Sequence, residues 1–186
     1  MTDAALAARV VAFAAPAALS TTQDLVRAAL PGLTDQADPD VVAEETLALV
    51  ATATARAAEV GLRARPDALA AAGPALAEVP YLYHDFLLGA EVVAAGAEGD
   101  HEPDQSVYQR LDRKLAFYTA HLAPGRFPGP SLLREKLPLW MGRISPPKLP
   151  TRPDARLEQT GAVDVLAAHA RLVMAFAQRA AEETAG

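Results

Sequence analysis

Apolar residues recur at every third or fourth position along most of this chain, and they alternate with polar residues over no useful length. A period of 3.6 residues is typical of an amphipathic α-helix, whereas a half-buried strand needs strict alternation. Alanine and leucine are the main apolar residues, and both lose little side-chain entropy in a helix. The sequence therefore predicts an all-α, single-domain helical bundle of about five or six helices over residues 1–186.

Capping residues and prolines predict where the first helices begin and end. Thr2 is a good N-cap for a helix that we expect to end near Pro16, because an internal proline loses a backbone hydrogen bond. Asp38 followed by Pro39 is a strong start signal for a helix that runs to about Val60. Further prolines predict that residues 66–80 are broken into short helical pieces.

The second half of the chain predicts a helical hairpin, an extended arm and a final helix. The hairpin comprises residues 81–97 and 105–122. A proline-rich strap follows over residues 142–156, and we expect it to wrap the surface with Trp140 and Ile144 as its anchors. The last helix begins after Thr160 and is apolar on two sides, which is typical of a helix buried between neighbours. His169 on this helix is expected to be a hydrogen-bonded core histidine.

The cysteine content, the N-terminal residues and the length of the apolar runs predict the cellular compartment of the protein. The chain contains no cysteine, which excludes disulfides and thiolate metal sites and fits a reducing, cytoplasmic compartment. Asp3 stands where a signal peptide needs positive charge, and no apolar run approaches the roughly 18 residues of a membrane span. We therefore expect a cytoplasmic protein that does not enter a membrane.

The net charge of −6 is unevenly distributed along the chain. Residues 105–156 contain ten basic and three acidic side chains, so the remainder, with seven basic and twenty acidic ones, is strongly negative. The favoured interpretation is that the basic segment docks on acidic side chains of the same chain or of a second copy. The alternative is phosphate or nucleic-acid binding through a basic strip formed by Arg110, Arg113 and Lys114.

Residues 80–130 hold most of the chemically distinctive side chains, including seven of the ten aromatic residues and three of the four histidines. If the predicted hairpin is antiparallel about residue 101, His84 faces Tyr118 and His121 faces Tyr81. This arrangement would collect a candidate ligand-binding site at one end of the hairpin, formed by His84, Asp85, Tyr118, His121 and Arg126. Two imidazoles and a carboxylate could also hold a divalent metal ion.

These features favour a non-catalytic protein that binds a partner protein or a small molecule and forms a homodimer. Nucleic acid is not the expected partner. Sequence signatures of phosphate loops, nucleophile elbows and zinc proteases are absent from the chain. The alternative is a metal-dependent hydrolase that uses His84, Asp85 and His121. The sequence predicts no particular cofactor.

Overall fold

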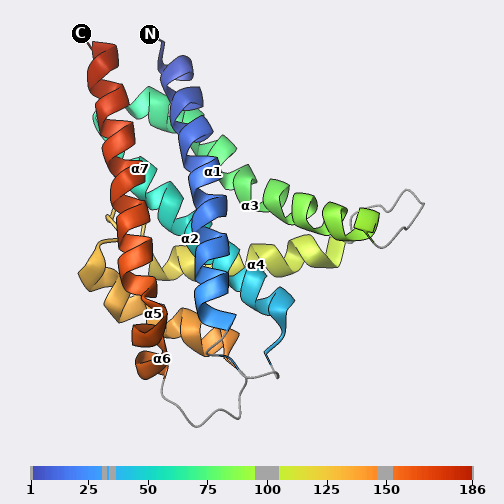
Figure 1. Ribbon diagram of the computed structural model, residues 1–186. Coiled ribbons are helices and arrows are strands. Elements are labelled where there is room, and N and C mark those ends of the chain that lie inside the picture. Colours follow the sequence, from blue (N-terminus) through green and yellow to red (C-terminus); the bar gives the residue numbers. More distant parts are fainter. Residues whose placement is uncertain (1, 31–32, 34–36, 95–104, 146–152, 186) are drawn as a thin grey trace.

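The computed structural model describes residues 2–30, 33, 37–94, 105–145 and 153–185, and these ranges contain seven helices and no strand (Figure 1). Side chains of residues 85–94, 105–107, 154 and 185 lie outside the description. The predicted all-α fold is confirmed. The helices are α1 (Asp3–Ala29), α2 (Pro39–Gly61), α3 (Pro66–Ala94), α4 (Gln105–His121), α5 (Pro130–Ile144), α6 (Pro153–Thr160) and α7 (Ala162–Ala185).

The long helices α1 and α7 lie side by side and run in opposite directions, so the two ends of the chain lie at the same end of the molecule (Figure 1). Helix α2 contacts both of them and also contacts α3, α4 and α5. Helices α3 and α4 extend away from the α1–α7 pair and approach each other toward their distant tip (Figure 1). Helix α2 is therefore the central element of the bundle.

Two clusters of buried side chains form the core. One joins α1, α2, α4, α5, α6 and α7, and it contains Leu25, Leu111 and the fully buried Trp140. The other joins α1, α2, α3 and α7 around Leu6 and Leu62. Alanine occupies many positions in both clusters, and small side chains at a contact allow helix axes to approach closely.

The predicted start signals of α1 and α2 are confirmed. Thr2 Oγ1 accepts a hydrogen bond from the Ala5 amide at 3.2 Å, and the Asp38 carboxylate accepts one from the Asp40 amide at 3.0 Å. Each bond satisfies an amide that has no partner within its own helix. Helix α2 ends at Gly61, within one residue of the predicted end.

The prediction that prolines end the early helices was wrong. Pro16 lies inside α1, and Pro74 and Pro80 lie inside α3. Pro16 is exposed, whereas Ala14 and Ala18 on either side of it are fully buried. Burial of the apolar side along the whole helix therefore offsets a local cost of about 3 kcal/mol for an internal proline.

The prediction of an extended strap over residues 142–156 was wrong at both ends of that range, where the chain is helical. Helix α5 continues through Ile144, and α6 begins at Pro153; residues 146–152 lie outside the described ranges. Trp140 and Ile144 are buried in the core as residues of α5 and do not anchor an extended strap. The Trp140 indole donates a hydrogen bond to Thr46 Oγ1 at 3.2 Å. Pro153 suits the first position of a helix, where no backbone donor is needed.

Helix α7 is buried on one side only. Leu166, Ala170 and Val173 are fully buried, whereas Leu172 on the second predicted strip is 56% exposed. The prediction of a helix buried on two sides was therefore wrong for much of its length. His169 is the exception on that strip and is a core histidine as predicted.

Helix α1 reaches the length and composition of a membrane-spanning helix, with a mean hydropathy of 1.5 over an 18-residue window. This differs from the sequence prediction, in which the first helix ends near Pro16 and no apolar run is long enough to span a membrane. In the bundle, α1 contacts α2, α3 and α7 along its buried side.

Candidate functional site

Two neighbouring glutamates of α2 organise the polar side chains that surround the candidate site. Glu44 Oε2 lies 2.6 Å from the Lys114 ammonium, and its Oε1 lies 3.4 Å from both His84 Nε2 and Arg110 Nη2. The side chains of Glu44 and Lys114 are only 12% and 10% exposed. One carboxylate therefore connects α2 to α3 and α4.

Glu45 connects α2 to α4 and α5 in the same way. Arg143 donates two hydrogen bonds to its carboxylate at 2.6 and 2.7 Å, and the Tyr118 hydroxyl donates a third at 2.8 Å. The guanidinium of Arg143 also lies 4.4 Å from the centre of the Phe117 ring. Successive residues on a helix point about 100° apart, which explains why the two glutamates bind different helices.

The surroundings of these side chains determine which of them carry a charge. Burial alone would raise the pKa of Glu44, but Lys114, His84 and Arg110 together hold that pKa below its ordinary value. Burial and the Glu45 carboxylate raise the pKa of Tyr118, so its hydroxyl stays protonated and donates. The hydrogen bonds from Arg143 to Glu45 raise the pKa of Arg143. We call Glu44, Glu45, His84, Lys114, Tyr118 and Arg143 the ion cluster.

The structure brings together only part of the predicted ligand-binding site. His84 and Tyr118 both belong to the ion cluster, through different glutamates. His121 is half-buried and lies against Phe117, with ring centres 4.5 Å apart. Arg126 is exposed in the connection between α4 and α5, and the Asp85 side chain lies outside the description.

The predicted pairing of the hairpin helices was wrong. Tyr81 donates a hydrogen bond to the Asp112 carboxylate, and its ring lies 6.0 Å from that of Tyr108. It therefore faces α4 more than two turns before His121, its predicted neighbour. The reason is that α3 and α4 each pack against α2 and diverge as they approach it (Figure 1).

The predicted anion-binding strip is also divided by the fold. Lys114 is buried against Glu44, whereas Arg110 and Arg113 are exposed. Arg113 donates to the carbonyl of Gln109 at 3.1 Å, and Arg110 reaches Glu44. Three basic side chains of the 105–156 segment thus dock on acids of α2, namely Arg110, Lys114 and Arg143.

Within the described side chains, no group of three His, Asp or Glu residues is arranged to hold a metal ion. The predicted metal set includes Asp85, whose side chain is not described, so the hydrolase alternative stays a prediction. Of the ring nitrogens of His84, Nε2 faces Glu44 and Nδ1 is buried without a hydrogen-bond partner.

A groove of about 830 Å³ opens where α3 and α4 diverge, with α2 as its floor. Sequence reasoning missed this groove, because it depends on the angle between two helices that were expected to lie in contact. Its walls are mainly alanine, leucine and proline: Ala51, Ala55, Pro66, Leu69, Ala70, Gly73, Leu76, Ala77, Pro80, Leu115 and Pro124.

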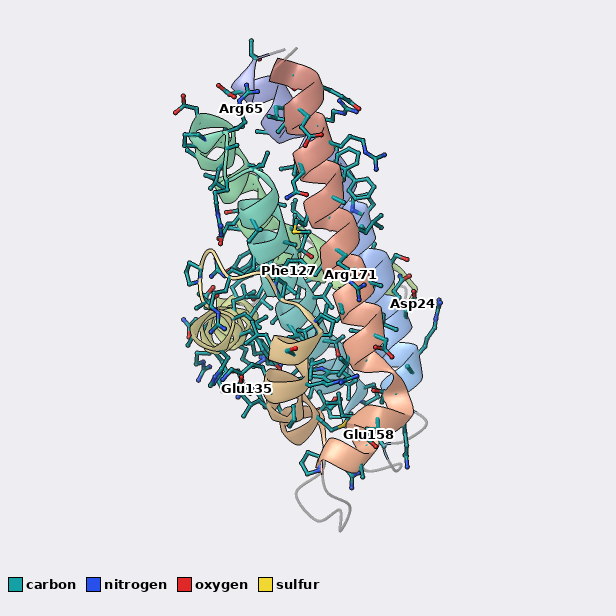
Figure 2. The ribbon with its side chains drawn as sticks, turned by 90° about the vertical axis from the view of Figure 1, so that its left-hand side faces the viewer. Asp24, Arg65, Phe127, Glu135, Glu158 and Arg171 are labelled. Atoms are coloured by element: carbon teal, nitrogen blue, oxygen red, sulfur yellow. The ribbon has the colours of Figure 1, made fainter. Side chains whose placement is uncertain are left out.

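Charged residues close the groove at the end of α2. Arg56 donates to the carbonyl of Leu122 at 2.8 Å and forms an ion pair with Glu59. Glu59 accepts from the Gly125 amide at 2.9 Å, and Arg63 donates to the Gly125 carbonyl at 2.7 Å. These bonds fix the connection after α4 to α2; Figure 2 shows this connection at Phe127, before the chain enters α5.

Compared with protein-family models, curated proteins and solved structures, the chain matches none of them. Its function therefore has to be inferred from the groove and the ion cluster.

Proposed function

We propose that this protein is a binding protein that receives an amphipathic helix of a partner protein in the groove between α2, α3 and α4. The observation that carries the proposal is the long, apolar shape of the groove. Its wall on α3 extends from Pro66 to Tyr81, with lining residues at nearly every helical turn. A helix laid into an apolar groove through residues three and four apart is a common mode of recognition.

The dimensions of the groove fit a half-embedded helix. Fifteen residue steps along α3, each rising 1.5 Å, give a length of about 22 Å. A volume of about 830 Å³ over that length gives a mean cross-section of roughly 38 Å². A helix about 10 Å wide has a cross-section near 80 Å², so a helix embedded to half its depth would fill the groove.

The residues that line the groove also favour a helix. Gly73 and four alanines present little side-chain bulk, which allows a second helix to approach α3 and α2 closely. Glu59, Arg63 and Glu78 lie around the apolar wall. A partner with an apolar stripe flanked by charged residues would match this pattern.

The ion cluster supports this function as a scaffold. Glu44 lies on the side of α2 that forms the groove floor, since Ala51 and Ala55 follow it at helical spacing. Its contacts with His84 and Lys114 join α3 and α4 to α2, about two helical turns before Ala51, the first groove-lining residue of α2. The Glu44 carboxylate, the His84 imidazole and the Lys114 ammonium group thereby help to fix the positions of α3 and α4 on α2. This structural role requires no substrate.

A substitution at Gly73 tests the proposal. Gly73 lines the groove, and a Cβ atom added there meets nothing within 4 Å, so we expect Gly73→Leu to place its side chain in the groove. Gly142→Leu is the matched control, because it also adds leucine in open space on a helix, outside the groove. The probe is a displayed library of 18-residue helical peptides, selected on the wild-type protein.

We expect the selected peptides to carry apolar residues three and four apart and to shift the amide resonances of Ala51, Ala70 and Ala77. Gly73→Leu should weaken their binding at least tenfold, and Gly142→Leu should not.

Selected peptides that bind equally well to Gly73→Leu would overturn the proposal. Binding of a small apolar dye in the absence of any peptide binding would favour a small-molecule site. Loss of a dimer on Gly73→Leu, measured by sedimentation equilibrium, would identify a second copy of the chain as the partner.

A further inference from the structure

The outward side of helices α1 and α7 exposes apolar side chains that no described helix covers. On α7, Leu172 is 56% exposed and Val165 is 36% exposed, and on α1 the side chain of Pro16 is exposed. In Figure 1 the two helices lie in front of α2 and α4, and the described helices leave this side of the pair open. We call it the α1–α7 face, which extends from Arg9 to Arg27 on α1 and from Val165 to Glu183 on α7.

The middle of this face lacks the charged side chains that an exposed helix usually carries. Helix α1 has no charged residue between Arg9 and Asp24, and only 33% of its most apolar 18-residue window is buried. The half-buried rings of Phe13 and Phe176 stack here, with their centres 4.0 Å apart. A contiguous exposed apolar surface on a folded protein marks a place where another molecule binds.

The two ends of the α1–α7 face each carry one positive and one negative side chain. At one end, Arg9 lies 2.7 Å from Glu183, and at the other end Arg27 lies 3.8 Å from Asp24. All four side chains are more than 40% exposed. Arg9 lies about two helical turns before Pro16, and Asp24 lies about two turns after it. The charges are therefore arranged so that the face is complementary to itself.

We propose that a second copy of this chain packs on the α1–α7 face in a two-fold dimer. The symmetry axis lies in the plane of the contact and crosses the helices near Pro16, so each helix lies antiparallel to its counterpart. The same face is then used on both copies, and every contact occurs twice. Arg9 of each copy lies opposite Asp24 of the second copy in this arrangement.

The arrangement also covers the most exposed apolar side chain of the face. Phe176 is level with Phe13, and α7 runs antiparallel to α1, so Leu172 is about level with Pro16 and close to the axis. Leu172 would therefore pack on the apolar middle of the second copy. An apolar centre with a charged rim is the usual composition of a protein interface.

The size of the face is sufficient for a stable dimer. The distance from Arg9 to Arg27 along α1 is about 27 Å at 1.5 Å per residue, and two helices side by side are about 20 Å across. The footprint is then about 540 Å² on each copy, or about 1,100 Å² in total, and a biological interface needs about 1,000 Å².

The charge of the face favours a second copy over a membrane or a nucleic acid. Its exposed charged side chains are Arg9, Arg27 and Arg179 against Asp24 and Glu183, so it is close to neutral. Anionic membranes and nucleic acids attract surfaces with a clear excess of basic side chains. The face is also separate from the groove, which α2, α3 and α4 form.

Leu172→Glu tests the dimer in the full-length protein. It places two like charges near the symmetry axis, so it should raise the dissociation constant of the dimer at least tenfold in sedimentation equilibrium. Leu82→Glu is the matched control, because Leu82 is a 63% exposed leucine on α3 that lies outside both the face and the groove lining. It should dimerise as the wild type does. Both leucines are exposed, so both variants should unfold at the wild-type temperature.

Mixing two charge-reversed variants tests the two-fold arrangement. Arg9→Glu and Asp24→Arg should each weaken the homodimer severalfold, because each brings like charges together at two places. An equimolar mixture of the two variants should dimerise more tightly than either alone, since a mixed dimer contains no like-charge contact between Arg9 and Asp24 positions. A mixture that dimerises no better than the separate variants would overturn this arrangement.

Three further outcomes would overturn the proposal. The first is a wild-type protein that stays monomeric at every concentration. The second is a dimer that Leu172→Glu leaves intact, and its dissociation by Gly73→Leu would then place the second copy in the groove. The third is binding of the monomer to phosphatidylcholine vesicles that Leu172→Glu abolishes, which would assign the face to a membrane. Peptides selected for the groove should bind Leu172→Glu and wild type equally, so this test is independent of the groove.

Discussion

The ammonium of Lys114 and the carboxylate of Glu44 lie 2.6 Å apart, with only about a tenth of each side chain exposed. This ion pair joins α4 to α2. Breaking a buried pair by removing one partner leaves the other charge uncompensated. The stability of the bundle should therefore depend on this pair more than on any exposed ion pair.

We expect Lys114→Met to lower the free energy of unfolding by about 3 kcal/mol, because Glu44 remains buried with weaker partners. The double variant Glu44→Gln/Lys114→Met should lose less than the sum of the two single variants. Urea unfolding of all three proteins measures both effects. Arg110→Met is the control: its side chain is 46% exposed, so the loss should stay below about 1 kcal/mol. Additive losses in the double variant would contradict the prediction.

His169 should make the protein sensitive to mild acid. Its ring lies 3.0 Å from the Thr21 hydroxyl and 2.7 Å from that of Thr54, and burial lowers its pKa from 6.5 to about 4. The folded protein then holds neutral His169 while the unfolded chain binds a proton below pH 6.5. Stability is therefore unaffected above pH 6.5 and falls as the pH drops from 6.5 toward 4, by an amount on the order of 3 kcal/mol in total.

This pH dependence can be separated from that of the ion cluster. Glu44 has a lowered pKa, so its contribution is present above its unfolded value near 4.5 and is lost only at lower pH. Urea unfolding between pH 7 and pH 5 should therefore report His169 rather than Glu44. His169→Gln should flatten this part of the profile, and an unchanged slope in the variant would show that another group is responsible.

Gly61 should tolerate no side chain. A Cβ atom added there would lie 2.6 Å from Ala177 Cβ and 2.7 Å from the Met174 carbonyl oxygen, both on α7. Gly61→Ala must push α2 and α7 apart, which should cost about 1–3 kcal/mol. Gly142→Ala on α5 meets nothing within 4 Å and should instead stabilise the protein by about 0.5–1 kcal/mol. A lower midpoint of thermal unfolding for Gly61→Ala together with a higher one for Gly142→Ala would support the close contact between α2 and α7. A higher midpoint for Gly61→Ala would contradict it.

Arg56 should hold the connection that closes the groove. It donates to the Leu122 carbonyl and pairs with Glu59, which in turn binds the Gly125 amide. Arg56→Met should free this connection and speed trypsin cleavage after the exposed Arg126. Arg9→Met, which removes an exposed pair with Glu183, serves as the control and should cleave at the wild-type rate. Equal cleavage rates in all three proteins would mean that the connection is held by other contacts.

Capping residues predicted where several helices begin, but the sequence did not predict that helices continue through their prolines. The Asp38–Pro39 start and the beginning of α4 at Gln105 were predicted because capping is decided by a few adjacent residues. The prolines at 16, 74 and 80 were misjudged because their local cost is outweighed by burial of residues far along the chain. Sequence periodicity contains no measure of that burial.

The ion cluster could be predicted only in outline. The basic excess of residues 105–156 indicated docking on acidic side chains, and Lys114 and Arg143 do bind Glu44 and Glu45. The two glutamates themselves were missed, although they interrupt an otherwise apolar stretch of a buried helix. The groove was beyond sequence reasoning, because it depends on how far α3 and α4 diverge.

Because α2 contacts α1, α3, α4, α5 and α7, none of these helices can separate without exposing part of its surface. Loss of α2 would in turn remove the floor of the groove and a wall of both core clusters. The bundle should consequently open as one cooperative unit. Amide protons near Val50 and Ala53, at the centre of α2, should exchange with solvent only through complete unfolding, at a rate set by the global stability of the protein.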